Sequence, residues 1–165
     1  NLGLCYRALG QYPQAIQHHQ GQLAIAREIG DRWGEGAALG NLGNAYHALG
    51  QYTKAIEHHQ QHLAIAREIG DRLGEGNALG NLGNAYGALG QYENAIEYYQ
   101  QALDIARQIG DRRGEGNALG NLGLVYEELG DLPRARQLWQ QALAIFEQLG
   151  VPEAELVRGW LERSS

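Results

Sequence analysis

The chain has 165 residues, of which 24 are glycine, only 3 are proline and 44% are hydrophobic. Glycine far above its usual share of ~7% often marks loops or disorder, but the ample apolar content and the scarcity of proline exclude a low-complexity tail. The formal net charge of −6 disfavours nucleic acid and anionic membranes as partners. No apolar run approaches the ~20 residues of a membrane span. The single cysteine, Cys5, excludes a disulfide framework, and it fits a cytoplasmic location.

The sequence repeats itself with a period of 40 residues. Segments 41–80 and 81–120 differ at 9 of their 40 positions, so 31 are identical. We therefore predict four units of one structure within residues 1–150, starting near residues 1, 41, 81 and 121, with the first unit truncated. Pro152 and the acidic residues beside it start a predicted C-terminal capping helix over residues 151–165.

Each unit carries two predicted helices separated by glycine. Asp71 can cap a helix over residues 72–89, on which apolar residues recur at spacings of three and four. Glu75 falls in the first turn of this helix, near the positive end of its dipole. Gly90 ends the helix, and a second one follows over residues 92–109. Nowhere does hydrophobicity alternate with period two, so we predict an all-α fold.

A family signature recurs in all four units. In the second unit it reads Leu42-Gly43-Asn44-Ala45-Tyr46, then Leu49-Gly50-Gln51-Tyr52, then Leu63-Ala64-Ile65-Ala66. This pattern resembles the tetratricopeptide repeat (TPR), although the usual TPR period is ~34 residues. The longer form is similar to the repeats of LGN/Pins-type adaptors and of bacterial multi-repeat proteins. The resemblance implies a right-handed α-solenoid of antiparallel helix pairs, the TPR superhelix.

Asparagines form a polar stripe along the first helix of each pair. Asn77, Asn81 and Asn84 are spaced by four and three residues, which places them on one helix face. The TPR resemblance implies that this helix lines a concave groove. An asparagine amide carries donors and an acceptor that match the backbone of an extended peptide. We therefore predict a peptide-binding groove made by Asn41, Asn44, His47, Asn77, Asn81, Asn84, Asn117, Asn121, Arg7 and Glu127.

Structural explanations compete with binding at several of these positions. Asparagine in the column of Asn41 is common in TPR sequences, where its amide can stabilise the stack of helices. The glycine column of Gly80 lies beside the stripe, and it allows either close approach of a ligand backbone or tight helix packing. Arg7 at one end and the pair Glu127 and Glu128 at the other give the groove a polarity that could orient a bound segment, the alternative at Glu128 being solvated surface charge.

Other motifs do not support a catalytic, metal or cofactor site. The segment 74–80 has the spacing GxGxxxG rather than GxGxxG, and no predicted strand precedes it, which argues against a nucleotide loop. His58 and His62 share a helix face without an HExxH motif, so adventitious metal affinity is the only alternative there. The aligned Tyr99 indicates that His59 is a ring in the core. A carboxylate clamp of the chaperone-docking type is rejected because glycine replaces a key clamp lysine.

We conclude from the sequence that the chain is a non-enzymatic scaffold for protein–protein interaction. It is expected to bind an extended peptide segment of a partner, or of its own parent chain, in the asparagine-lined groove. Asn1 enters partway along a helix and methionine is absent, so we expect a fragment of a longer protein. One alternative is a structural spacer or self-assembling array that forms a homodimer through the truncated N-terminal face. Another is the sensor arm of a larger bacterial signalling protein.

Overall fold

The computed structural model describes residues 3, 6 and 9–164 of the chain. Within this described part the chain forms eight helices and no strand, which confirms the predicted all-α fold. None of these helices has the length and apolar character needed to cross a membrane. The helices are α2 (Tyr12–Ile29), α3 (Arg32–Ala48), α4 (Tyr52–Ile69), α5 (Arg72–Ala88), α6 (Tyr92–Ile109), α7 (Arg112–Glu128), α8 (Leu132–Leu149) and α9 (Glu153–Arg163).

Two kinds of helix alternate from α2 to α8, and each has its own boundary signals. Helices α3, α5 and α7 begin after an aspartate whose carboxylate accepts a hydrogen bond from the backbone N–H three residues later, at 2.8–2.9 Å. Helices α2, α4, α6 and α8 end at a glycine with φ between +64° and +72°, a conformation that glycine adopts without strain. The predicted cap at Asp71 and the predicted helices 72–89 and 92–109 are confirmed within one residue.

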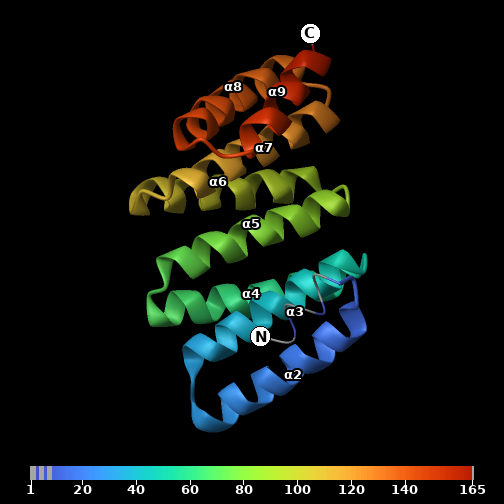
Figure 1. The fold of residues 1–165 in the computed structure, drawn as a ribbon, viewed down its shortest axis with the longest axis vertical. Coiled ribbons are helices and arrows are strands. Elements are labelled where there is room, and N and C mark those ends of the chain that lie inside the picture. The colour runs from blue at the N-terminus through green and yellow to red at the C-terminus, as the bar shows by residue number, and fades with distance from the viewer. Residues whose placement is uncertain (1–2, 4–5, 7–8, 165) are drawn as a thin grey trace.

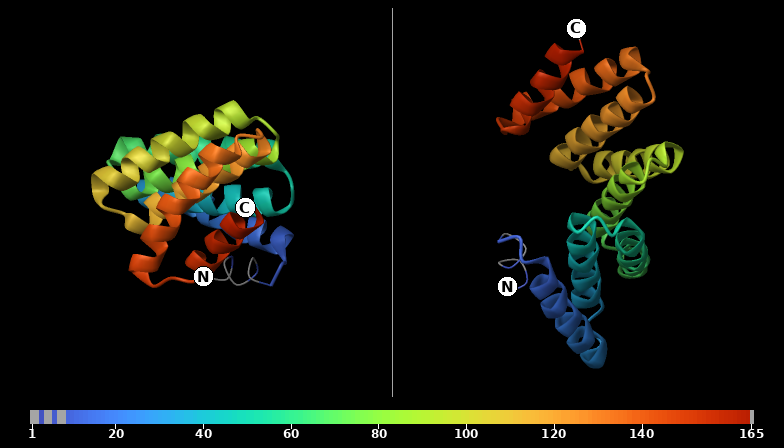
Figure 2. Two further views of the ribbon diagram at one scale, coloured as in Figure 1. Left: turned by 90° about the horizontal axis from the view of Figure 1, so that it is seen from above. Right: turned by 90° about the vertical axis from the view of Figure 1, so that its right-hand side faces the viewer.

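Consecutive helices pack against one another in a single stack that runs from α2 to α9 (Figure 1). Each helix contacts the one before it and the one after it, and α5 also contacts α3 and α7. In the side view the stack bends, so that α2 and α9 lie on the same side of the middle helices (Figure 2). This arrangement of antiparallel helix pairs is an α-solenoid, in which each pair buries its apolar face against the next.

A buried ring lies inside each helix pair. The ring positions recur at intervals of forty residues and are at most 4% exposed, and they hold His19, His59, Tyr99 and Trp139. The predicted core role of His59 is therefore confirmed. The preceding helix has a glycine opposite the ring. A Cβ at Gly43, Gly83 or Gly123 would lie only 2.2–2.6 Å from the nearest ring atom, so a larger residue would clash there. Close packing against a ring is thus the reason for this glycine column.

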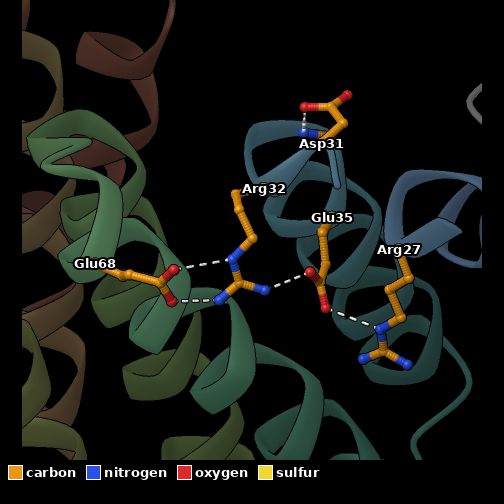
Figure 3. A network of polar contacts seen from close by, with 6 residues as sticks. Arg27, Asp31, Arg32, Glu35 and Glu68 are labelled. Carbon is orange, nitrogen blue, oxygen red and sulfur yellow. Dashed lines mark hydrogen bonds and ion pairs between the residues drawn. The ribbon is translucent and has the colours of Figure 1, made fainter. Parts of the chain in front are cut away.

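A buried glutamate links three successive helices through arginines (Figure 3). Arg27 of α2 donates from Nε to the carboxylate of Glu35 on α3 at 2.8 Å, and Arg32 pairs with the same carboxylate. Arg32 also makes a two-point ion pair with Glu68 of α4. The hydrogen bond from Arg27 is the main cause that lowers the pKa of Glu35. Paired arginines likewise hold Glu75 and Glu115. For Glu75 the sequence had suggested only an interaction with the helix dipole.

Candidate functional site

An open cavity of about 210 Å³ lies between α5, α6 and α7. Five of the predicted groove residues line it, and they come from two helices. The contributors are Asn77, Asn81 and Asn84 on α5, and Asn117 and Asn121 on α7. We refer to this space as the asparagine cavity. The folding of the repeat thus brings together amides that are as many as 44 positions apart, from Asn77 to Asn121.

The floor of the asparagine cavity is apolar and belongs to α6. Its lining side chains are Tyr99, Ala102, Ile105, Ala106 and Ile109. Sequence reasoning missed these residues, because the TPR resemblance directed attention to the first helix of each pair. A signal was nevertheless present, since the second unit has His62 where the third unit has Ala102. A smaller side chain at this position leaves room beneath the asparagine stripe.

Asn84 has a structural role as well as a place in the cavity wall. Tyr99 donates its hydroxyl to the Asn84 Oδ1 atom at 2.7 Å, and the Asn121 amide nitrogen donates to the same oxygen at 3.3 Å. Burial raises the pKa of Tyr99, so its hydroxyl stays protonated as a donor. Within the described residues, no hydrogen bond engages the side chain of Asn77, Asn81 or Asn117. Their donors and acceptors are therefore open to a ligand.

The glycine column beside the stripe differs from repeat to repeat. A Cβ on Gly40 would lie 3.0 Å from the His62 ring, and a Cβ on Gly120 would lie 3.4 Å from the Trp160 ring of α9. A Cβ on Gly80 would meet nothing within 4 Å. Gly40 and Gly120 therefore abut side chains of other helices, whereas Gly80 faces the open asparagine cavity.

A second hollow, of about 420 Å³, adjoins the asparagine cavity and shares Asn84, Asn121 and Tyr99 with it. His47, predicted as a groove residue, lines this second hollow together with Glu128. Glu128 accepts a hydrogen bond of 3.4 Å from the hydroxyl of Tyr92, which also lines the hollow. At this end of the groove the lining carboxylate is that of Glu128, whereas the sequence had favoured its neighbour Glu127.

Three further predicted groove residues do not line the asparagine cavity. Asn41 lines a hollow of about 440 Å³ between α2 and α3. Asn44 is half-buried on α3. Glu127 is half-buried on α7, and Arg7 lies outside the described residues.

An exposed apolar edge accompanies the groove. Trp33 at the start of α3 is 67% exposed, and the corresponding Leu73 at the start of α5 is 53% exposed. Both line a hollow of about 260 Å³ that also includes His62 and Asn77. Burial lowers the pKa of His62, and burial is also the main cause that lowers the pKa of His59 to about 3. Both rings are therefore neutral at neutral pH.

The stacked antiparallel helix pairs and the glycines that recur every forty residues are typical of helical repeat proteins. A model of the tetratricopeptide repeat matches residues 1–68 and 74–148, and the chain belongs to this family. None of the curated proteins matches the chain significantly.

Solved structures share the fold at low identity. BtubC from P. vanneervenii is 22% identical with a TM-score of 0.87, over 99% of this chain and 68% of that one. A Rap protein complexed with competence and sporulation factor is 20% identical with a TM-score of 0.85, over 98% of this chain and 46% of that one. A signal transduction ATPase with a tetratricopeptide repeat sensor, from Pyrococcus horikoshii, is 26% identical with a TM-score of 0.80, over 93% of this chain and 24% of that one.

Proposed function

We propose that this chain is a non-enzymatic scaffold that binds an extended peptide segment of a protein partner, or of its own parent chain. Membership in the TPR family supports a role in protein–protein interaction. The observation that carries the finer proposal is the convergence of five asparagines from α5 and α7 on one cavity. Asparagine is a mediocre helix former, so a stripe of asparagines within helices favours a function beyond helix formation.

The arrangement suits the backbone of an extended chain. An extended peptide exposes one N–H and one C=O group at each residue, and each amide of the cavity can both donate and accept. Within the described residues, the side-chain amides of Asn77, Asn81 and Asn117 make no hydrogen bond, so they are the ones that can bond to a peptide backbone. Contacts of this kind recognise the course of a backbone rather than particular side chains.

Asn77→Ala combined with Asn81→Ala tests this proposal. A peptide selected from a random-sequence display library on the unaltered protein is labelled, and its affinity is measured by fluorescence anisotropy. Two lost amide contacts of about 1 kcal/mol each should weaken binding roughly tenfold or more. Asn84 is left unchanged, because Tyr99 and Asn121 already use its carbonyl oxygen.

Asn94→Ala is the matched control, since Asn94 is exposed on α6 and bonds only to Gln91 in the described part of the chain. Circular dichroism should give the same helical content for all variants. Full affinity in the double variant would contradict the groove proposal, whereas loss of affinity in the Asn94 variant as well would show that the effect is not specific to the cavity.

Several further expectations belong to the same proposal. Nucleic acid and membranes are not expected as partners, in view of the net charge of −6, and the single cysteine fits a cytoplasmic location. We propose four units over residues 1–150 and a capping helix over 151–165, a division that the packing of α9 on α8 supports. The similarity to LGN/Pins-type adaptors and the homodimer through the N-terminal face stay predictions, and light scattering would test the latter.

A sensor arm of a larger signalling protein is the second candidate function. The likeness to the signal transduction ATPase from Pyrococcus horikoshii, whose repeats are described as a sensor, favours this function. In that case the groove would bind a segment of the parent protein in one signalling state. The sequence of the full-length protein would separate this candidate from a free-standing scaffold.

A further inference from the structure

We infer that the asparagine cavity is an anchor pocket for an aromatic side chain of the bound segment. This inference rests on the proposed peptide-binding function and adds to it a specificity that amide contacts to a backbone cannot supply. Binding energy at protein interfaces is concentrated where an aromatic anchor fills a pocket. The cavity lies beside Gly80, where a Cβ would meet no atom within 4 Å, whereas an aromatic ring lies against the equivalent glycine of each neighbouring unit.

Among the described repeats, a ring lies directly against the glycine column on both sides of Gly80, although hollows of about 260 and 110 Å³ remain beside those rings. In the preceding unit the His62 ring lies 3.0 Å from the position of a Cβ on Gly40. In the following unit the Trp160 ring lies 3.4 Å from the position of a Cβ on Gly120. At Gly80 the residue that corresponds to His62 is Ala102, and the space is open.

The C-terminal helix shows what kind of side chain such a space accepts. The Trp160 ring on α9 lies over Gly120, in a pocket that Asn117, Asn121 and Phe146 also line. Its indole packs at a tilt on Trp139, with the ring centroids 5.7 Å apart. An aromatic ring from another helix therefore lies over Gly120, the repeat equivalent of Gly80, and lines a smaller hollow of about 110 Å³.

The asparagine cavity offers the same contacts with more room. Tyr99 stands where Trp139 stands, and Ala106 replaces the bulkier Phe146. Cavities of roughly 150 Å³ with apolar walls bind benzene, so a volume of about 210 Å³ is sufficient for an aromatic ring. The apolar floor of α6 would contact the face of the ring, and the open amides of Asn77 and Asn81 would bond to the adjacent peptide backbone.

The test uses N-acetyl-tryptophanamide as the probe and N-acetyl-leucinamide as its aliphatic control. Backbone amide resonances of the ¹⁵N-labelled chain are followed while each probe is added at millimolar concentration. We expect saturable shifts from the tryptophan probe at Gly80 and Ala102, and at least fivefold weaker binding of the leucine probe. Equal binding of the two probes, or shifts confined to other helices, would overturn the inference.

Two substitutions fill the space over Gly80 without removing any asparagine. Ala102→His imports the residue that covers the corresponding glycine, Gly40, in the preceding unit. Gly80→Leu fills the cavity from α5, where a Cβ meets nothing within 4 Å, and it also replaces glycine inside a helix. In both variants the affinity for the tryptophan probe should fall at least tenfold. Ala144→His, at an exposed position of α8, is the matched control and should bind the probe normally.

The same variants separate this inference from the proposed function. If the closed variants still bind the library-selected peptide at full affinity while the Asn77 and Asn81 double variant does not, the groove stands and the anchor pocket is refuted. If the tryptophan probe binds at Gly80 although no library peptide depends on the asparagines, the pocket stands and the backbone-binding groove fails. Thermal melting confirms that each variant is folded, and we expect Gly80→Leu to melt at a temperature at least as high as that of the unaltered chain.

Discussion

Glycines only three residues apart on α5 have opposite environments. Gly83 lies under the buried ring of Tyr99, and a Cβ there would be 2.6 Å from a ring carbon. Gly80 faces the asparagine cavity and has free space around it. Any glycine inside a helix costs roughly 1 kcal/mol relative to alanine, so each position needs a compensating reason. At Gly83 the reason is packing, whereas at Gly80 the open space is the feature that we relate to ligand binding.

We predict that alanine has opposite effects at these two glycines. Gly83→Ala should destabilise the chain by about 1–3 kcal/mol, because the buried ring cannot move without disturbing the core. Gly80→Ala should stabilise it by about 0.5–1 kcal/mol through helix propensity alone. Urea denaturation followed by circular dichroism measures both changes under the same conditions. A change of the same sign in the free energy of unfolding of both variants would show that the two glycines do not have the different environments that the packing indicates.

At the scale of the helix, the chain uses a buried carboxylate to fasten three helices. Glu35 is 8% exposed, whereas its partners Arg27 and Arg32 are about half exposed, so the arginines keep part of their hydration. Arg32 extends the link to Glu68 on α4. Exposed ion pairs alone contribute little to stability, but removing the carboxylate would leave arginines without their partner at a helix junction.

We predict that Glu35→Gln destabilises the chain by about 1–2 kcal/mol at neutral pH, the range for hydrogen bonds to charged groups. The pKa of Glu35 is lowered in the folded state, so the carboxylate contributes fully above its unfolded pKa of about 4.5. This contribution is lost as the pH falls through the lower folded pKa. The difference between the urea midpoints of the unaltered chain and the variant should therefore be larger at pH 7 than at pH 3.

Glu28→Gln is the control for this prediction, because Glu28 is exposed and makes no ion pair within the described residues. Its urea midpoint should stay within experimental error of the unaltered chain at both pH values. A constant difference between the Glu35 variant and the unaltered chain across the pH range would argue that lost packing, and not the charged network, explains the effect.

The order of the helices and their ends could be predicted from the sequence, because local signals determine them. Asp71 and the glycines that end α4 and α6 act on their own turns, and a repeat places every helix against its chain neighbours. The asparagine cavity could be predicted only in part. Its amides lie on one helix face in the sequence, but its depth depends on Ala102 of another helix. The rings that cover Gly40 and Gly120 are His62 and Trp160, whose contacts appear only after the helices stack.

At the scale of the whole molecule, the stack brings the asparagines of alternate helices to one cavity. Residues from α5 and α7 meet at the cavity because these helices contact each other across the intervening α6. The second hollow continues the groove towards His47 of α3. A partner segment that follows this course would therefore cross α3, α5 and α7 in turn. We propose that such a segment binds here and not on the opposite surface.

The most direct test of this claim is to observe the side-chain amides of the asparagines themselves. The ¹⁵N-labelled chain is titrated with the library-selected peptide, and the Nδ2 resonances are assigned and followed by NMR. We predict that the resonances of Asn77, Asn81 and Asn117 shift together along one saturable binding curve while that of Asn94 stays in place. Saturable binding that leaves these three resonances unchanged, and instead shifts the resonances of residues on the exposed outer faces of α4 and α6, would contradict binding in the asparagine-lined groove.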